Sequence, residues 1–286
     1  MKFWKGIVSG CVTLLMASAV SAATPNWTED FSSLTTGTSY GFGVWPPTTV
    51  AAVTDKAADM VDDWLVGPRA ASSFVTVDTC PITSTAVPAG TKTLLINSTS
   101  TTANDDVAVI SPVSTGATGK VKYEWYICYP QAVSATALPG NCVFGMGFAD
   151  SSGNRIYSGT GANIQEPFQI QVGKDNAAAN HTWRLVVAGA TVAASQTAPS
   201  IAWDQFGAQW IKVGMEVDPA TKTVKGYLND TLNWTYDFTS SDTSTWDFSK
   251  SYFMVRAYPA MTQPVYLTKV SYTATAGSSV QDWSNR

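Results

Sequence analysis

The stretch QWIKVGMEVDPATKTVKGYLND, residues 209–230, carries the clearest fold signal in this sequence. Hydrophobic and polar residues alternate along residues 209–219 and again along residues 222–230, and this is the period of a β-strand with one buried face. Between the two runs, Pro219 presets a tight bend within the segment DPATK. The stretch therefore predicts an antiparallel β-hairpin.

The same period of two continues outward from this hairpin in both directions. Only residues 54–67 are also compatible with a helical turn, and they fit a loop equally well. No internal repeat or linker divides the chain. The pattern predicts an all-β fold, a single-domain antiparallel two-sheet β-sandwich. Further strands are predicted at 29–33, 92–99, 106–113, 119–128, 142–150, 167–173 and 181–189.

A second stretch, KSYFMVRAYPAMTQPVYLTKVSY at residues 250–272, predicts two more strands joined by a proline-marked bend. Side chains alternate along a strand, so Phe253, Val255 and Ala257 form an apolar core face. The opposite face carries two phenols and a guanidinium in a row. We interpret that face, formed by Tyr252, Met254, Arg256 and Tyr258, as the floor of a binding cleft.

The N-terminus has the features of a secretory signal. A short basic start precedes an apolar run at 6–16 and small residues at 17–22, so residues 1–22 are expected to be removed. We expect a domain over 23–276, a polar tail over 277–286 and a secreted product. The apolar run is too short to span a bilayer. The segment VSGC at 8–11 leaves a lipoprotein open, and a periplasmic location is also left open.

Composition narrows the choice of partners. Only 13% of the residues are charged, the net charge is −4 and no basic cluster occurs, which disfavours nucleic acid. Eleven Trp and eleven Tyr residues could serve as platforms for sugar rings or could fill a β core. We expect a monomer whose partner is an extracellular polysaccharide. The indoles considered as sugar platforms are Trp45, Trp64, Trp203, Trp234 and Trp246.

Three cysteines remain after the signal segment, and a bridge is expected in an oxidising compartment. Cys128 ends one predicted strand and Cys142 begins the next. We therefore predict a Cys128–Cys142 disulfide and a free, buried Cys80. The single histidine, His181, and the lack of a close cysteine pair disfavour a Cys/His metal site.

The sequence of residues 209–230 resembles the hairpin of concanavalin A-like jelly rolls, as found in laminin-G-like, lectin and glucanase domains. EDFSSL and VYLTKVSYTA fit the first and last strands of that group. The resemblance covers most of residues 29–275 and implies the fold. It also leaves open a structural calcium ion with Glu29, Asp30 or Asp218 as ligands, although no metal site is predicted from the residues.

A narrower resemblance is to jelly-roll polysaccharide lyases of the alginate- and glucuronan-lyase type. Their concave sheet carries R-x-E-L-R, Q-I-H or Q-I-V, and Y-F-K-A-G-x-Y. This chain has KYEWY at 122–126, QIQ at 169–171 and YFMVRAY at 252–258, in the same order. The histidine and both arginines of the family are replaced here, and the family's lysine and glycine have become Met254 and Arg256.

The resemblance implies β-elimination on a uronic-acid-containing glycan. Such a reaction needs a group that neutralises the C5 carboxylate, a base and an acid. Tyr258 is the preferred base and acid, and Tyr252 the reserve. The other implied catalytic residues are Arg256, Gln169 and Lys122, and the implied substrate-binding residues are Glu124, Tyr126, Gln171 and Arg184.

Alternatives remain open beside the lyase. The same polar face fits a non-catalytic carbohydrate-binding module, and the Thr- and Ser-rich, weakly charged composition fits a surface structural subunit. A retaining glycoside hydrolase is disfavoured because no E-x-D-x-x-E set of carboxylates is present. A serine hydrolase is disfavoured because no G-x-S-x-G motif occurs.

Overall fold

The computed structural model describes residues 26–40, 51–53, 64–68, 73–99, 107–132, 142–149, 168–172, 184–187, 190–191, 206–241, 243–244 and 246–275. The predicted signal segment, His181 and the tail 277–286 lie outside these residues. Within them every regular element is a β-strand, and no helix has the length and apolar character needed to cross a membrane. The predicted all-β fold is confirmed.

The strands form two antiparallel sheets, each with nine strands in the described part of the chain. The first, called here the β9 sheet, runs in the order β16 (Thr231–Asp237), β15 (Thr223–Leu228), β14 (Gln209–Asp218), β9 (Val121–Tyr129), β18 (Val265–Ala274), β6 (Lys92–Ser98), β5 (Ser73–Thr79) and β2 (Ser39–Tyr40), with β1 (Trp27–Glu29) paired to β18.

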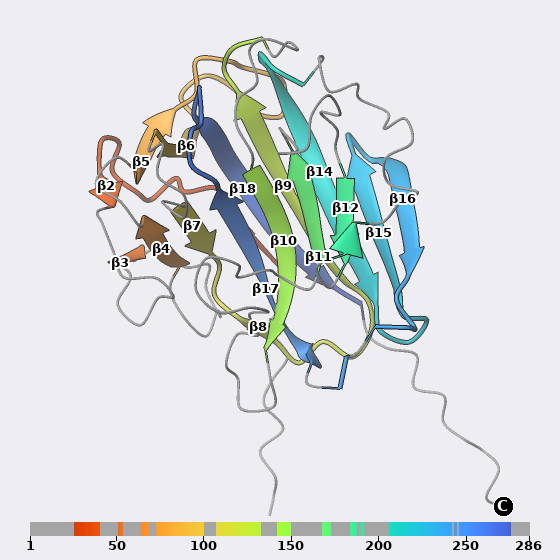
Figure 1. Cartoon of the computed structure of the whole chain (residues 1–286). Coiled ribbons are helices and arrows are strands. Elements are labelled where there is room, and N and C mark those ends of the chain that lie inside the picture. The colour runs from red at the N-terminus through yellow and green to blue at the C-terminus, as the bar shows by residue number, and fades with distance from the viewer. Residues whose placement is uncertain are drawn as a thin grey trace, which may run out of the picture.

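The second sheet, called here the β17 sheet, packs against the first (Figure 1). Its order is β13 (Ala190–Thr191), β12 (Arg184–Val187), β11 (Phe168–Val172), β10 (Cys142–Ala149), β17 (Asp247–Ala257), β7 (Val107–Ile110), β4 (Trp64–Pro68) and β3 (Ala51–Val53), with β8 (Ser114–Thr115) paired to β17. The arrangement is an antiparallel two-sheet β-sandwich, as the sequence predicts.

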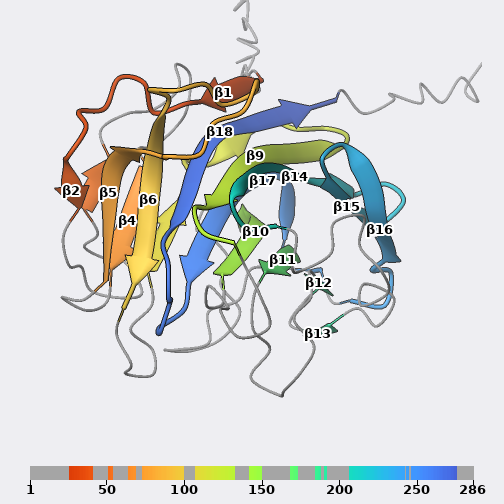
Figure 2. The same ribbon diagram turned by 90° about the horizontal axis from the view of Figure 1, so that it is seen from above.

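Figure 2 shows that the β9 sheet arches over the β17 sheet. The outer face of the β9 sheet is therefore convex, and the outer face of the β17 sheet lies on the hollow side of the arch. Consecutive strands often belong to different sheets. For example, β9 is in one sheet and β10 in the other, and the same holds for β18 and β17. The proline-marked segment between β17 and β18 therefore crosses from one sheet to the other.

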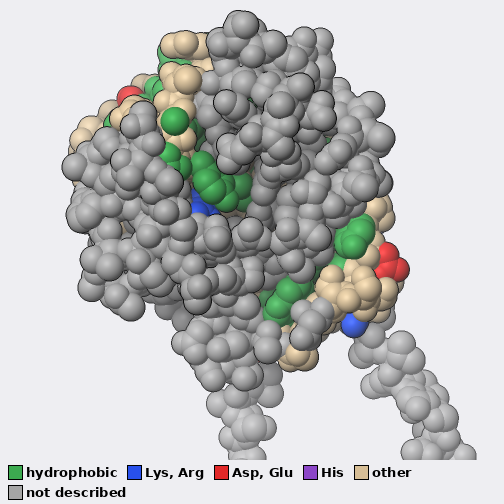
Figure 3. Space-filling model, viewed as in Figure 1, with side chains coloured by type: hydrophobic (Ala, Val, Ile, Leu, Met, Phe, Trp, Pro, Cys, Tyr) green, Lys and Arg blue, Asp and Glu red, His purple; other side chains and the backbone are tan. Residues whose placement is uncertain are grey.

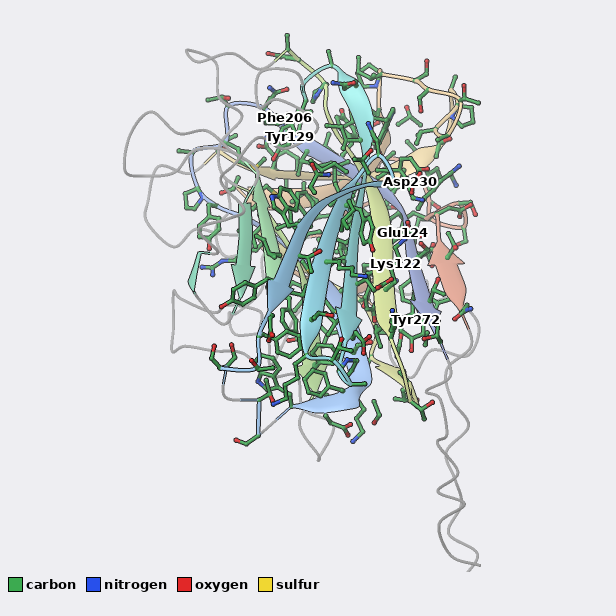
Figure 4. The ribbon with its side chains drawn as sticks, turned by 90° about the vertical axis from the view of Figure 1, so that its right-hand side faces the viewer. Lys122, Glu124, Tyr129, Phe206, Asp230 and Tyr272 are labelled. Atoms are coloured by element: carbon green, nitrogen blue, oxygen red, sulfur yellow. The ribbon has the colours of Figure 1, made fainter. Side chains whose placement is uncertain are left out.

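Aromatic side chains fill the space between the sheets. Trp125 of β9 packs on Phe253 of β17 with ring centroids 4.9 Å apart, and on Phe144 of β10 at 5.9 Å. At one end of the core, Tyr129 and Phe206 meet at 5.3 Å (Figure 4). Such rings bury large apolar areas and hold the sheets together.

The predicted hairpin of β14 and β15 is confirmed, and β16 extends it into a three-stranded unit. β15 and β16 are joined by Asn229 and Asp230, whose φ angles are 46° and 64°. Two positive φ values in a two-residue loop make a type I′ turn, which Asn and Asp tolerate well. The sequence pattern predicts these two residues at the end of a strand and does not predict β16.

Candidate functional site

The two faces of β17 differ as its sequence predicts. Phe253, Val255 and Ala257 lie in the core between the sheets. Tyr252 and Met254 belong to a separate buried cluster on the other side of the strand, with Ala108 and Ile110 of the neighbouring β7. The phenol and guanidinium face of β17 therefore lies on the outer, hollow side of the β17 sheet.

This face is far more enclosed than an open sheet surface. Tyr252 has no exposed surface and Arg256 only 2%, whereas Tyr258 is half-buried. The guanidinium of Arg256 lies over the Tyr258 ring, 4.5 Å from its centroid, as a cation–π pair. Figure 3, which views the molecule from this side, shows a recess in which hydrophobic side chains lie beside a Lys or Arg side chain.

β10 supplies a flat floor for these large side chains. In CVFGMGFA its aromatic residues point into the core, while Gly145 and Gly147 alternate with them on the outer side. Gly147 pairs with Tyr252, and a Cβ atom at Gly147 would lie 2.0 Å from Cζ of the Tyr252 ring. The ring thus lies across the glycine. This role of the two glycines was not predicted, although the alternation of large and small residues along β10 indicates it.

Backbone register aligns three other predicted residues with this face. Gln171 of β11 pairs with Val143, which in turn pairs with Arg256, and Gln171 also pairs with Arg184 of β12. Gln169 occupies the corresponding position beside Gly145. Arg256, Gln171 and Arg184 therefore lie in one row across the β17 sheet.

The structure does not bring the first predicted motif to this face, so the expectation that all three motifs share one sheet is wrong. Lys122, Glu124 and Tyr126 belong to β9, in the other sheet, and alternate with the buried Tyr123 and Trp125. They consequently lie on the convex outer face, on the far side of the core. A sandwich core, about 10 Å thick between its sheets, separates the two groups.

Lys122 and Glu124 instead belong to an ion-pair network on the convex face (Figure 4). Glu124 Oε1 lies 2.9 Å from Nζ of both Lys122 and Lys212, and Lys212 Nζ lies 2.7 Å from Oδ1 of Asp230. Lys122 also lies over the Tyr227 ring, 4.9 Å from its centroid. These ion pairs link β9, β14 and the turn between β15 and β16.

The titration of this network follows its ion pairs. Burial acts to raise the pKa of Glu124, but hydrogen bonds from Lys122 and Lys212 outweigh it and hold the pKa below its ordinary value. Burial acts to lower the pKa of Lys212, and hydrogen bonds to Asp230 and Glu124 outweigh it, raising the pKa to about 12. Both groups are therefore charged near neutral pH.

The predicted Cys128–Cys142 disulfide is not formed, and Cys80, Cys128 and Cys142 are all free and buried. Cys142 faces the core between the sheets. Cys128 lies on the outer side of β9, in a separate cluster that also contains Cys80. The chain crosses between the sheets after β9, which places the two thiols on different faces and explains the error.

The acids considered as calcium ligands have local structural roles. Glu29 accepts a hydrogen bond from the backbone of Phe31, Asp30 from that of Ser32, and Asp218 from those of Ala220 and Thr221. No group of three or more potential metal ligands occurs in the part of the chain that the structure describes.

Two of the indoles considered as sugar platforms are core residues. Trp64 has no exposed surface and Trp234 only 4%. Trp234 lies across Gly226 of the neighbouring strand, where an added Cβ would be 2.5 Å from its ring. Trp246 packs against the core, and Trp45 and Trp203 lie outside the described residues.

The chain matches no protein-family model, and no curated protein matches it. Among solved structures, it is similar to the potassium-bound carbohydrate recognition domain of Emp46p, with 9% identity over 73% of this chain and 87% of the other, and a TM-score of 0.44. The chain is also similar to the cellulose induced protein Cip1, with 12% identity over 88% of this chain and 98% of the other, and a TM-score of 0.44.

A third similar structure is a carbohydrate esterase from the Shiga toxin-encoding bacteriophage phi24B. It is 13% identical over 85% of this chain and 99% of the other, with a TM-score of 0.46. These likenesses are distant. They add no argument about activity or ligand to what the sheets and their side chains provide.

Proposed function

We propose that this protein binds an acidic extracellular polysaccharide on the outer face of the β17 sheet. The observation that carries the proposal is the Arg256–Tyr258 pair on the hollow side of the sandwich. A uronic acid residue presents both a carboxylate and an apolar ring face. Arginine recognises carboxylates through the N–H groups of its planar fork, and a tyrosine ring packs against apolar surfaces.

The cation–π contact suits this task, because the Tyr258 ring lies against the guanidinium of Arg256 and helps to fix its position. Because Arg256 is almost fully buried, its charge is held in one place. A positioned cation loses less conformational entropy on binding than a mobile surface lysine does.

The backbone register adds a row of positions that crosses several strands. Arg256, Gln171 and Arg184 lie in line across β17, β11 and β12, with β10 between the first two. A row of this kind runs across the sheet, as an elongated polymer would. It favours a chain of several sugar units over a single small sugar.

β-Elimination on a uronate-containing glycan is the second candidate, and the same pair supports it. Arg256 would neutralise the C5 carboxylate of the sugar, and the neighbouring phenol of Tyr258 would take the adjacent proton and return one to the leaving oxygen. Tyr252 is fully buried, which favours Tyr258 as the acting phenol. Lys122 is on the opposite face and would take no part.

Binding is tested by retardation in native gels that contain alginate, glucuronan or a neutral glucan. We expect retardation by the acidic polymers, and Tyr258→Ala should weaken it about tenfold because the stacking surface and the support for Arg256 are lost. Arg256→Lys should also weaken it, since the charge stays and the planar fork does not.

Lys122→Gln is the matched control, because it removes one cation from the other outer face and should leave retardation unchanged. Loss of retardation with Lys122→Gln but not with Tyr258→Ala would place the site on the β9 sheet and contradict the proposal. Elimination is tested separately by the ultraviolet absorbance of the unsaturated uronate. An absorbance increase that Tyr258→Phe abolishes would establish the lyase; binding without any increase would establish a binding protein.

A further inference from the structure

Residues 80–91, called here the strap, cross the convex face of the β9 sheet and are fixed to it. The indole N–H of Trp210, in β14, donates a 2.7 Å hydrogen bond to the carbonyl oxygen of Ile82. Lys269 of β18 donates from Nζ to the carbonyl oxygen of Ala86. Lys269 has a φ of 49° and lies where the register of β18 shifts against β9, so a β-bulge aims it at the strap.

The strap covers a small apolar cluster that is distinct from the main core. Val87 of the strap is 2% exposed and packs with Trp210 and Tyr266. Cys80, the first residue of the strap, and Cys128 of β9 belong to the same cluster, and they are 9% and 1% exposed. The strap thus holds Cys80 beside the outward-facing thiol of Cys128.

The two thiols interact directly. A hydrogen bond from the Cys128 thiol lowers the pKa of Cys80, and this effect outweighs burial, which acts in the opposite direction. Hydrogen bonding to Cys80, together with burial, raises the pKa of Cys128. Cys80 is therefore the thiol that forms the thiolate more readily, and the thiolate is the reactive nucleophile.

We propose that Cys80 and Cys128 are a redox pair that closes to a disulfide by exchange with a small-molecule disulfide, stapling the strap to β9. The Cys80 thiolate attacks one sulfur of the donor, breaks its S–S bond and releases one thiol, leaving a mixed disulfide on Cys80. The Cys128 sulfur, after losing its proton, attacks Cys80 and releases the second thiol. Two protein thiols become one disulfide, and one donor disulfide becomes two thiols.

The placement of the third cysteine excludes it from this pair. Cys142 faces the main core from β10, in the other sheet, where its thiol interacts with Tyr129. The strap segment and β9 are also far apart along the chain, so a bond between them closes a long loop. In the chain-entropy account, long loops give the larger stabilisation.

The test uses the full chain, refolded with a mixture of oxidised and reduced glutathione, so that exchange occurs before the strap closes. Free thiols are then blocked with N-ethylmaleimide, and the protein is digested with trypsin without reduction. We expect a linked pair of peptides, residues 70–92 and 123–155. The second contains both Cys128 and Cys142, so Cys142→Ser is the decisive companion variant, and it should retain the link.

Thermal unfolding provides a second readout. Oxidised protein and oxidised Cys142→Ser should both lose roughly 5–10 °C in Tm on addition of dithiothreitol. Cys80→Ser should show no link and no response of Tm to the reductant. Alkylation of both Cys80 and Cys128 after refolding, or a link that Cys142→Ser abolishes, would overturn the proposal.

Discussion

The two outer faces of this sandwich both carry charged side chains, but the charges differ in their exposure to water. On the convex face, Lys122, Glu124 and Lys212 remain partly exposed and neutralise one another across two neighbouring strands, β9 and β14. On the hollow face, Arg256 is 2% exposed and forms a cation–π pair with Tyr258. The charges on the convex face remain hydrated, whereas the charge of Arg256 is largely removed from water.

The difference shows what each face can do. An exposed ion pair contributes little to stability and is screened by salt, so a network of such pairs acts mainly to keep the surface soluble and the strands aligned. An enclosed cation interacts more strongly with whatever approaches it, because little water screens it. This is the physical reason for proposing the anion site on the hollow face, around Arg256.

The largest expected contrast comes from removing one cation from each face. Arg256→Ala should lower the free energy of unfolding by about 3 kcal/mol, because a buried guanidinium and the packing of its stem are lost. Lys122→Ala should cost less than about 1 kcal/mol. Urea unfolding of both variants measures the two values, and equal costs would refute the contrast between the faces.

A pair of glycines gives the next contrast. Gly147→Ala places a Cβ 2.0 Å from the Tyr252 ring, and it should cost about 1–3 kcal/mol because the buried ring has to move. Gly214 lies on the convex side, where a Cβ would be 3.4 Å from Cβ of Tyr227, an ordinary contact. Gly214→Ala should change stability by less than about 0.5 kcal/mol. Thermal unfolding of both proteins decides the comparison.

A smaller effect is expected within the convex network itself. A double-mutant cycle with Glu124→Gln and Lys212→Met should give a coupling energy of about 0.5–1 kcal/mol, which 1 M salt should reduce. A coupling that is several times larger and insensitive to salt would mean that this face is as sheltered as the hollow one.

The smallest expected effect is the dependence of stability on pH. The folded-state pKa of Glu124 is lowered, so its contribution is fully present above its ordinary value of 4.5 and is lost as the pH falls through the lowered value. Because Glu124 is partly exposed, the loss should be a few tenths of a kcal/mol. Unfolding curves from pH 6 to about pH 3 should fall less steeply for Glu124→Gln than for the unchanged protein; parallel curves would contradict this.

Strand phase could be predicted from the sequence, because alternation along one strand is a local property. The core face of β17 and the hairpin of β14 and β15 were both predicted correctly in this way. Alternation does not reveal which sheet a strand joins. β9 and β17 show the same pattern of large apolar residues, yet they face each other across the core.

The errors in the candidate site have this single origin. The three motifs follow the family's order along the chain, but order does not place Lys122 and Arg256 on one sheet. The disulfide prediction failed in the same way, because proximity in sequence across the segment after β9 was taken as proximity in space. Crossing between sheets depends on long-range pairing, which a single sequence does not display.

The positions of β17 and β18 have a consequence for biogenesis. β17 lies between β10 and β7, and β18 lies between β9 and β6, so each joins the earlier-made strands of its sheet to the later ones. A ribosome makes these two strands last among those described. The two halves of each sheet therefore cannot be joined until β17 and β18 have been made. Pairing between strands so far apart along the chain is slow. Until β17 and β18 are made, the half-sheets keep unpaired edge strands, which expose the nascent chain to edge-to-edge aggregation.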